Sequence, residues 1–577
     1  MFHLECVTEQ TNLRCETQWS EPQKGLHYGC VTLTTDSPCL FQPVKLQFFF
    51  PSIEAHYIWT PKINLIRALN PSWYRNLYTS NAFTGAPVNS ILRYDDQNIC
   101  TWAFSDTFET AVLRSWAIEE TGMYECSVTL FQNESSPRAS YQAQFRIDTR
   151  PIRYDQALAD AAFWWEAQAV NRPCHVPEDA RHAMYSTWYS YHQALHPEAL
   201  LHECVQARRL GCETIILDDG WQTADGNRGY AYCGDWESCP KKIPDMRAFC
   251  DAAHRLGMKV MLWYSVPYIG VHSSHFQEFK DRLLAYVTPD WAVLDIRYPE
   301  IRAFLIDTYE SALREWDLDG FKLDFVDDFV VIPPESPQIS PEMDFPDMLH
   351  AADALFTQCM QRLQAIRPDV LIEFRQTFNG PVMRRYGNML RAVDAPMDSD
   401  ENRVRITDLR LLAGSTAVHS DMLMWHYDDA VESAAMQLSA VFFSVPQLSM
   451  RLSELNESHA AMLTFYMGLW NRYRHVLLDG RLEAAAPQLR YPQLRATLGG
   501  QFAAAIYGCP EVEIPPDCGD ALILNACYGR RIYLLTHRPY LARRYSCTGA
   551  QLETFPIEPG TAILSVTPAD VLILSLE

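Results

Sequence analysis

The distribution of apolar residues along the chain changes character twice, at about residue 150 and at about residue 480. Up to residue 150, apolar residues occur in short runs separated by turn residues, such as VKLQFFF (44–50), GMYECSVTLF (122–131) and SYQAQFRID (140–148). Runs of this length and composition are typical of strands, and few stretches show helical periodicity. Residues 1–150 are therefore predicted to form an N-terminal β-sandwich.

In residues 151–480, apolar runs of strand length alternate with amphipathic helical stretches such as 245–257 and 300–316. Apolar strands that are joined through helices indicate a parallel sheet buried on both faces. A series of eight such units predicts a central TIM (β/α)8 barrel. The predicted strands are MYSTWYS (184–190), ETIILDDG (213–220), KVMLWYS (259–265), GFKLDFV (320–326), VLIEFR (370–375), MLRAVD (389–394), STAVHSDM (415–422) and LSAVFFS (438–444).

Strand-like runs return in residues 481–577, for example RIYLLT (531–536) and DVLILSL (570–576). They predict a small C-terminal β-domain. The fold class expected for the whole chain is thus multidomain α/β, with the barrel between two β-domains.

Composition limits the partners and the compartment. The net charge of −23 repels phosphate backbones and anionic headgroups, so neither nucleic acid nor membrane is an expected partner. The 17 cysteines are scattered singly, which favours a reducing compartment over a disulfide framework or a zinc site. The first 13 residues lack the basic start and apolar core of a signal peptide. We expect a cytoplasmic protein that needs no metal and no cofactor.

Strand 320–326 combines apolar residues with two charges. TIM-barrel enzymes place their catalytic groups at the carboxyl ends of the strands. Side chains alternate along a strand, so Lys322 and Asp324 face the barrel axis while Leu323 and Phe325 face the helices. A lysine beside Asp324 keeps that carboxylate ionised, as a nucleophile requires. A buried structural ion pair explains the same pattern equally well.

A second acidic group ends strand 213–220. Asp218 and Asp219 can each accept a hydrogen bond from a sugar hydroxyl, and Trp221 offers an apolar face to a sugar ring. The alternative is a turn followed by a helix N-cap, because Asp and Gly favour both.

Glycoside hydrolysis requires two carboxyl groups that flank the scissile bond, one as nucleophile and one as acid. If Asp324 attacks, segment 391–403 supplies three candidates for the acid: Asp394, Asp398 and Asp400. Asp394 is the best placed because it terminates an apolar strand. Asp398 and Asp400 lie further into the loop, where solvated loop acids are the simpler interpretation.

These motifs resemble glycoside hydrolase family 36, which contains α-galactosidases and shares a clan with family 27. The most specific stretch is LDDGWQ (217–222), GDW (234–236), KKIPDM (241–246) and HRLGMKVMLWYS (254–265), in the order and spacing of the family. GFKLDF (320–325) resembles the family's nucleophile motif, with Leu in place of Trp. The resemblance implies a retaining, exo-acting α-galactosidase that takes an oligosaccharide or glycoside substrate. Homo-oligomers are common among such relatives.

The resemblance also assigns roles. It makes Asp324 the nucleophile and Asp394 the acid/base, with Asp400 as the alternative because SDEN (399–402) holds a literal Ser-Asp. It assigns substrate binding to Asp218, Asp219, Trp188, Trp263 and Lys322. Trp221, from its own motif, and Arg375, from the loop after the fifth strand, complete the substrate-binding residues that we expect.

One departure from the family concerns the loop after the fifth strand. The family carries a Cys- and Gly-rich loop there, which contacts the sugar around C2. EFRQTFNGP (373–381) has no Cys and one Gly, so Arg375 and Gln376 would form that wall. The glycone is therefore open between galactose, N-acetylgalactosamine and other α-linked or pentose relatives.

Three other interpretations remain at the level of sequence. A transglycosylase uses the same residues with a sugar as acceptor. A non-catalytic sugar-binding barrel predicts loss of Asp324 or Lys322, and both are present. A metal-dependent enzyme would use Asp218, Asp219 and His419, although His419 fits a hydrogen-bonded core residue better.

Overall fold

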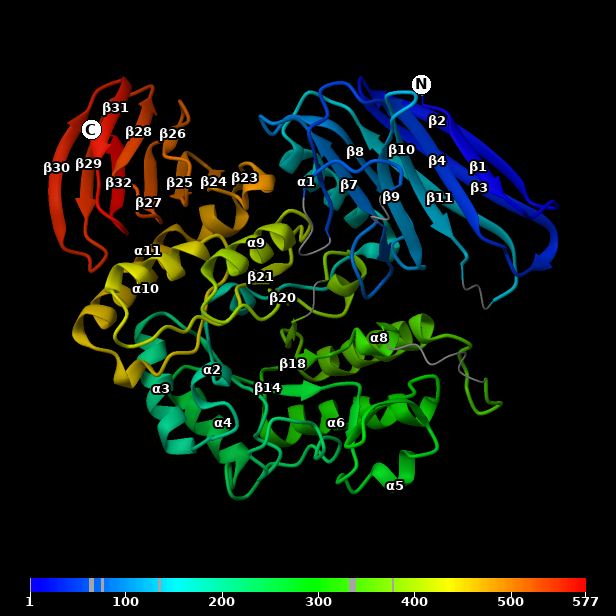
Figure 1. The fold of residues 1–577 in the computed structure, drawn as a ribbon. Coiled ribbons are helices and arrows are strands. Elements are labelled where there is room, and N and C mark those ends of the chain that lie inside the picture. Colours follow the sequence, from blue (N-terminus) through cyan, green and yellow to red (C-terminus); the bar gives the residue numbers. More distant parts are fainter. Residues whose placement is uncertain are drawn as a thin grey trace.

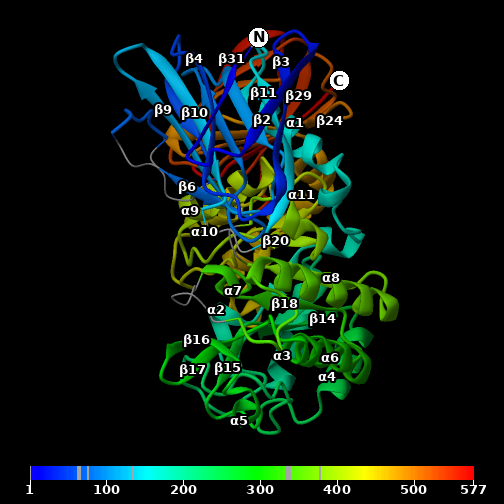
Figure 2. The same cartoon turned by 90° about the vertical axis from the view of Figure 1, so that its right-hand side faces the viewer.

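The computed structural model describes residues 2–61, 67–73, 77–132, 136–331, 339–375 and 378–576. The chain has three parts, with the N-terminal β-sandwich and the C-terminal β-domain above a central barrel (Figure 1). The view turned by 90° shows both β-domains on the same side of the barrel (Figure 2). The multidomain α/β fold predicted from the sequence is confirmed. Gln376 lies outside the described residues.

The N-terminal part consists of two antiparallel sheets packed face to face. One sheet has the order β1 (Leu4–Thr8), β4 (Val44–Pro51), β10 (Met123–Leu130), β9 (Ala111–Ile118), β6 (Tyr78–Ser80). The other has the order β2 (Arg14–Gln23), β3 (Leu26–Cys39), β11 (Arg138–Asp148), β8 (Asn98–Phe104), β7 (Val88–Leu92), β5 (Tyr57–Trp59). Val31, Leu46, Phe48, Trp102 and Phe145 are fully buried between the sheets. Inward-facing apolar residues from both sheets thus form one core, as a sandwich requires.

The central sheet contains eight parallel strands within the described residues. Parallel bridges from His419 to Val445 and from Leu423 to Leu448 join its two edges and close it. The strands, in spatial order, are β12 (Met184–Ser186), β13 (Thr214–Leu217), β14 (Lys259–Ser265), β18 (Gly320–Asp324), β19 (Leu371–Phe374), β20 (Met389–Arg391), β21 (Ala417–His419) and β22 (Gln447–Leu448). Seven of them coincide with predicted strands.

The eighth predicted strand is wrong. Residues 438–444 complete helix α10 (Val431–Ala440) and the turn after it, and the eighth strand is Gln447–Leu448. Leu438 and Phe442 are fully buried. A helix end that is apolar on every side has the same pattern as a buried strand, so periodicity alone does not distinguish the two.

Helices surround the barrel, and two of them correspond to the helical patterns in the sequence. α4 (Met246–Arg255) begins where Asp245 accepts a hydrogen bond from the Ala248 amide (2.9 Å), as an N-cap does. α6 (Pro299–Trp316) begins with proline at its first position. The other helices are α1 (Tyr154–Glu166), α2 (Trp188–Tyr191), α3 (Pro197–Arg209), α5 (Phe276–Phe279), α7 (Asp328–Val331), α8 (Met348–Ile366), α9 (Ser399–Arg410) and α11 (Glu457–Asp479). A small sheet follows β14, with the order β15 (Tyr268–Gly270), β17 (Trp291–Leu294), β16 (Leu283–Thr288).

Residues two apart on each barrel strand point inward at successive levels. The lowest level is apolar, and its members form one buried cluster that includes Met184, Ile216, Met261, Leu371, Met389 and Ala417. The next level is polar, and its buried members include Ser186, Lys322, Glu373, Arg391 and His419. One end of the barrel is therefore a packed core, and the other end holds ionisable groups.

The C-terminal part is a β-domain. Its larger sheet has the order β23 (Arg481–Ala484), β24 (Gln493–Leu498), β25 (Gln501–Ile506), β27 (Asp520–Asn525), β32 (Val571–Leu576), β29 (Tyr540–Tyr545), β30 (Gln551–Ile557). A three-stranded sheet has the order β26 (Glu511–Glu513), β28 (Arg531–Thr536), β31 (Gly560–Ser565). A separate apolar core, including Phe502, Ile523, Leu534 and Leu574, lies between them.

One buried polar cluster joins all three parts of the chain. Arg67, from the N-terminal part, donates two hydrogen bonds to Asp408 of α9 (2.8 and 2.7 Å). Trp59 Nε1–H donates to Asp408 (3.1 Å) and to the hydroxyl of Tyr491, in the C-terminal part (2.9 Å). Asp408 and Arg67 are both buried. The two β-domains are thus fixed to the barrel and to each other at one carboxylate.

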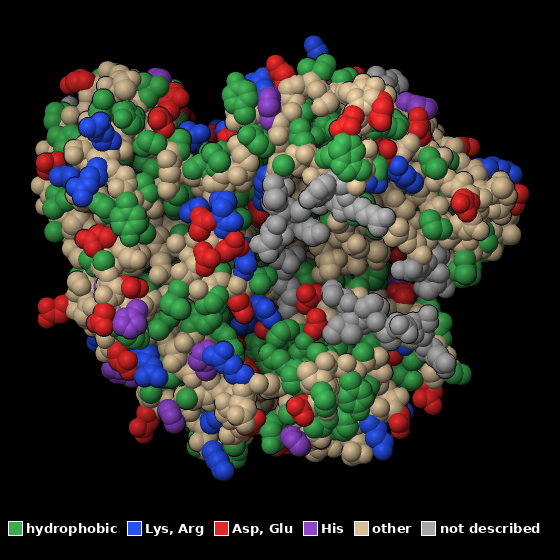
Figure 3. All heavy atoms as spheres, in the orientation of Figure 1, with side chains coloured by type: hydrophobic (Ala, Val, Ile, Leu, Met, Phe, Trp, Pro, Cys, Tyr) green, Lys and Arg blue, Asp and Glu red, His purple; other side chains and the backbone are tan. Residues whose placement is uncertain are grey.

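The outer surface carries both kinds of charge. In the space-filling view, acidic and basic side chains are interspersed, and a notch separates the C-terminal β-domain from the sandwich (Figure 3). Among the helices in the described ranges, none has both the length and the apolar character that crossing a bilayer requires.

We predict that Asp408→Ala lowers the free energy of unfolding by about 3–5 kcal/mol, because it leaves the buried Arg67 guanidinium without its carboxylate. Asp400→Ala, on the same helix, removes a carboxylate that pairs with Arg403 and Arg490 and is itself about half exposed, so it should cost less than about 1 kcal/mol. Urea unfolding of the two variants measures the difference. Equal losses would show that Asp408 does not hold the three parts together.

Candidate active site

A small cavity opens where the barrel strands end. We call it the site cavity. Its lining residues come from six consecutive strands or from the turns after them: Trp188, Asp218, Asp219, Tyr230, Trp263, Lys322, Asp324, Phe325, Arg375, Arg391 and Asp394. Eight of the ten site residues predicted from the sequence are among them. Parallel strands carry their terminal side chains to one edge, so residues that are distant in sequence meet there.

Asp324 ends strand β18 and is buried. Its Oδ2 accepts a hydrogen bond from Trp263 Nε1–H (2.9 Å). Its Oδ1 accepts from the Phe325 amide (2.8 Å) and from Arg375 Nε–H (2.9 Å). Burial disfavours the charged carboxylate, but Arg375, Lys322 and Trp263 outweigh it, so the pKa of Asp324 lies below its ordinary value. Asp324 is therefore ionised at neutral pH.

Lys322 lies two residues earlier on the same strand and faces the same cavity, as alternation predicts. Its direct ion-pair partner is Asp218, across the sheet, with Nζ and Oδ2 2.6 Å apart. Both side chains are almost completely buried. Lys322 therefore neutralises Asp218 by contact and stabilises the charge on Asp324 at longer range.

Asp219 adjoins Asp218 and has a different environment. Its carboxylate accepts hydrogen bonds from Gln193 Nε2–H (2.7 Å) and Gln222 Nε2–H (2.8 Å), both neutral amides. Burial raises the pKa of Asp219 to about 6. Gly220 has φ +110°, and a Cβ there would lie 2.7 Å from Gln193. The glycine therefore allows the chain to turn directly after the two acids.

Asp394 lies across the cavity, three residues after strand β20 ends. Its Oδ1 accepts a hydrogen bond from Arg391 Nη2–H (3.0 Å), and its Oδ2 is 3.8 Å from Arg375 Nη1. Burial favours the neutral acid, but Arg391, Arg375 and Lys322 outweigh it and lower the pKa of Asp394. In the unliganded site, Asp394 is held as a carboxylate.

The two remaining predicted residues lie outside the site cavity. Trp221 is fully buried behind it, where its Nε1–H donates to the Trp263 carbonyl (2.9 Å). It supports the cavity wall and offers no face to a ligand. Asp400 lies at the start of α9 and pairs with Arg403 and Arg490. Asp398 is the N-cap of that helix and accepts from the Glu401 amide (2.9 Å).

Phe325 departs from the alternation expected for its strand. The sequence pattern directs it toward the helices, whereas the structure places it in the cavity wall. Strand β18 ends at Asp324, and Phe325 adopts φ +60°. This left-handed conformation turns the chain, so the alternation stops at Asp324, two residues before the end of the predicted strand.

Residues 170–440 match the family model described as Melibiase. α-Galactosidase 2 of Pediococcus pentosaceus is 26% identical over 240 residues, which cover 39% of this chain and 31% of that protein. A Flavonifractor plautii protein, described as an A type blood alpha-D-galactosamine galactosaminidase, is 25% identical over 175 residues, or 27% of this chain and 15% of that protein. Among solved structures, a family 36 α-galactosidase of Geobacillus stearothermophilus in complex with stachyose has a TM-score of 0.64 at 14% identity, covering 98% of this chain and 81% of that one.

Residues 170–440, which form most of the barrel, thus resemble the melibiase family. The matched segment runs from just before the first barrel strand to the end of α10 and contains every residue that lines the site cavity. In its family match and its fold, the barrel is similar to α-galactosidase-like glycoside hydrolases, as the sequence motifs predicted. The sequence matches span about a third or less of the length of these curated relatives.

Three residues that line the site cavity were not predicted. Arg391 is the last residue of β20, is almost fully buried, and contacts both Asp394 and Asp421. Arg391 is a charged residue on the otherwise apolar strand MLRAVD, as Lys322 is on its strand, so the same argument could have predicted it. Tyr230 stacks on Trp263, with ring centroids 6.0 Å apart. It comes from a loop without periodicity, so no pattern indicates it. Phe325 is the third.

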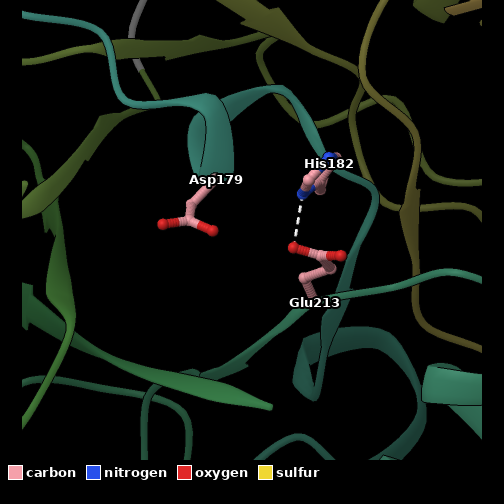
Figure 4. Close-up of side chains that lie close together, drawn as sticks. All are labelled: Asp179, His182 and Glu213. Atoms are coloured by element: carbon pink, nitrogen blue, oxygen red, sulfur yellow. Dashed lines mark hydrogen bonds and ion pairs between the residues drawn. The ribbon is translucent and has the colours of Figure 1, made fainter. Parts of the chain in front are cut away.

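Two groups of His and carboxylate side chains lie away from the site cavity. One consists of Asp179, His182 and Glu213, before the amino end of β13, where His182 points toward Glu213 (Figure 4). Lys259 Nζ lies 3.3 Å from Asp179, and Arg208 Nη1 lies 3.0 Å from Glu213. These carboxylates are already neutralised by cations, so we assign no metal there.

The second group, Asp251, His254 and Asp317, is similar. Arg247 contacts both of its acids, and Arg367 also pairs with Asp317. His419, considered above as a metal ligand with Asp218 and Asp219, is fully buried and donates Nε2–H to the Ala180 carbonyl (2.8 Å). It is a hydrogen-bonded core residue.

We predict that Asp219→Asn changes the pH dependence of stability. The folded pKa of about 6 exceeds the ordinary value of about 3.9, so the unfolded chain releases this proton first as pH rises. The free energy of unfolding of the wild-type protein therefore falls by about 1.4 kcal/mol per pH unit between about pH 4 and about pH 6 because of this group. Above that range, Asp219 causes no further loss.

Thermal unfolding at half-unit pH intervals tests this. The melting temperature of Asp219→Asn should rise relative to wild type across that window and hold a constant offset above it. An offset that is the same at every pH would show that Asp219 has an ordinary pKa.

Proposed function

We propose that this protein is a retaining, exo-acting α-glycosidase that hydrolyses terminal α-linked galactose-like residues. The observation that carries the proposal is the pair Asp324 and Asp394, two carboxyl groups from different strand ends that line one cavity. Asp324 is buried and ionised, which suits a nucleophile. Asp394 is the more exposed of the two, with 41% of its side chain accessible, which suits a group that exchanges a proton with a leaving group or water.

In the first step, an Asp324 oxygen attacks the anomeric carbon, and the bond from that carbon to the glycosidic oxygen breaks. Asp394, protonated for this step, gives its proton to the departing oxygen. The products are the free alcohol and a glycosyl ester of Asp324. Trp263 and the Phe325 amide hold the attacking carboxylate by hydrogen bonds, so little reorientation is needed at the moment of reaction.

In the second step, water attacks the same carbon. Asp394, now a carboxylate, takes one proton from the water, and the bond to Asp324 breaks to restore its carboxylate. Two displacements at one carbon retain the α-configuration. The three cations Lys322, Arg375 and Arg391 stabilise the Asp324 carboxylate as it re-forms.

The remaining lining groups suit a sugar. Asp218 and Asp219 present carboxylate oxygens that accept hydrogen bonds from hydroxyl groups, and Lys322 donates. Trp188 and Tyr230 contribute aromatic surface on which the apolar face of a pyranose ring packs.

Two glycones are favoured by the relatives. The Pediococcus protein is named for α-galactose, and the Flavonifractor protein for α-galactosamine. We propose galactose as the primary glycone. A panel of aryl α-glycosides that differ only at C2 and C4 of the sugar distinguishes the two glycones. If the 2-amino or 2-acetamido sugar is hydrolysed faster than galactose, that sugar is the primary glycone instead of galactose.

We predict that Asp324→Ala abolishes turnover of an aryl α-galactoside, because the carboxylate that forms the glycosyl ester is removed. With added azide, Asp324→Gly should yield the β-galactosyl azide, since a small anion then attacks once, with inversion. Product analysis by NMR checks both results. Wild-type rates in Asp324→Ala would exclude Asp324 as the nucleophile.

We predict that Asp394→Ala loses about 10²–10⁴-fold in kcat/KM on galactosides with poor leaving groups and much less on those with acidic leaving groups, because only the former need protonation. Asp400→Ala is the matched control, since Asp400 lies outside the site cavity and pairs with Arg403 and Arg490. Its leaving-group dependence should equal that of wild type. The reverse assignment would follow if Asp400→Ala alone showed the selective loss.

A further inference from the structure

Arg375 contacts both proposed catalytic carboxyl groups at once. Its Nε–H donates to Asp324 Oδ1 at 2.9 Å, and its Nη1 lies 3.8 Å from Asp394 Oδ2. One planar guanidinium therefore spans the space between nucleophile and acid. This is the space that the anomeric carbon and the glycosidic oxygen must enter.

The guanidinium is held in this place. Its carbon lies 4.8 Å from the centroid of the Phe325 ring, a cation–π distance, and only 17% of the side chain is exposed. Phe325 itself is fixed in the wall by the left-handed backbone turn after Asp324. The position of Arg375 thus follows from the same turn that ends the nucleophile strand.

The two carboxyl groups have opposite requirements in the first step. Asp324 must be ionised and Asp394 must be protonated, whereas a cation beside both favours the ionised form of both. In the second step, the same cation assists the departure of Asp324 as a carboxylate but opposes the uptake of a proton by Asp394 from the attacking water. Arg375 therefore opposes both events that need a proton on Asp394, and only one of them, protonation of the leaving group in the first step, depends on the aglycone.

We propose that Arg375 is a positioning residue that keeps both catalytic carboxyl groups charged and so selects glycosides with acidic leaving groups, such as phenolic aglycones, over alkyl glycosides and oligosaccharides. This inference rests on the proposed function. It assigns the aglycone class, which neither the family nor the fold determines.

Other ionisable groups also lie near the two carboxyl groups and contribute to their pKa values. These contributions remain when Arg375 is replaced. Asp324 is influenced by Lys322, Arg391, Asp327, Asp328 and Tyr230. Asp394 is influenced by Arg391, Lys322, Asp421 and Tyr189. Arg375 is the residue among these that contacts both carboxylates directly. Its removal should therefore shift both pKa values in the same direction.

The test compares Arg375→Met with wild type on two galactosides, one phenolic and one alkyl. Loss of the cation should move both limbs of the pH profile of kcat/KM for the alkyl substrate upward by about one pH unit or more. At neutral pH, the preference for the phenolic over the alkyl substrate should fall at least about tenfold, because more Asp394 is protonated. Arg375→Lys, which restores a charge, should recover part of the wild-type preference.

Arg362→Met, the same change in an exposed ion pair on α8, is the control and should leave the profile unchanged. Unshifted limbs and an unchanged preference in Arg375→Met would overturn the proposal and leave Arg375 a structural residue. If wild type turns over neither substrate, the proposed function fails instead. The Asp394 carboxyl can then be titrated by ¹³C NMR, with Asp394→Asn to assign its signal. A pKa that does not rise in Arg375→Met overturns the inference without any need for turnover.

Discussion

The site depends on mutual neutralisation of charges that the barrel removes from water. An isolated buried carboxylate or ammonium group would be too costly to keep ionised, so three acids at the carboxyl end of the barrel pair with groups of opposite charge. Lys322 forms an ion pair with Asp218, Arg375 with Asp324, and Arg391 with Asp394. Because two of these pairs join residues of different strands, the strands must align in the correct register before Asp218 and Asp324 are stabilised.

Much of this arrangement follows from residue spacing alone. Inward positions recur every second residue, so Gly320, Lys322 and Asp324 occupy three successive levels of one strand, and the sequence reveals both the strand and its polar end. Parallel strands end at one edge, which brings Asp218 and Asp394 to the same cavity as Asp324. The barrel, the flanking β-domains and most of the site were therefore predictable without coordinates.

The incorrect predictions concern residues whose positions depend on a turn or on the pairing between strands, which the local sequence pattern does not contain. Trp221 adjoins two site acids in sequence, but the turn at Gly220 directs it behind the wall. Phe325 enters the cavity because one backbone angle reverses sign after Asp324. The eighth strand, Gln447–Leu448, is too short for any periodicity. The pairing of Lys322 with Asp218 rather than with its neighbour Asp324 is set by the register between strands, which one strand's sequence does not contain.

The central claim is that Asp324 forms a covalent bond to the sugar during turnover. Incubation with a 2-deoxy-2-fluorogalactosyl or 5-fluorogalactosyl fluoride of slow turnover, followed by proteolysis and peptide mass spectrometry, tests it most directly. The account predicts a stable mass increase of one fluorosugar on the peptide that contains Asp324, fragmenting to that residue. An adduct on Asp394 or another residue, or turnover without any adduct and with release of the β-anomer, would contradict it.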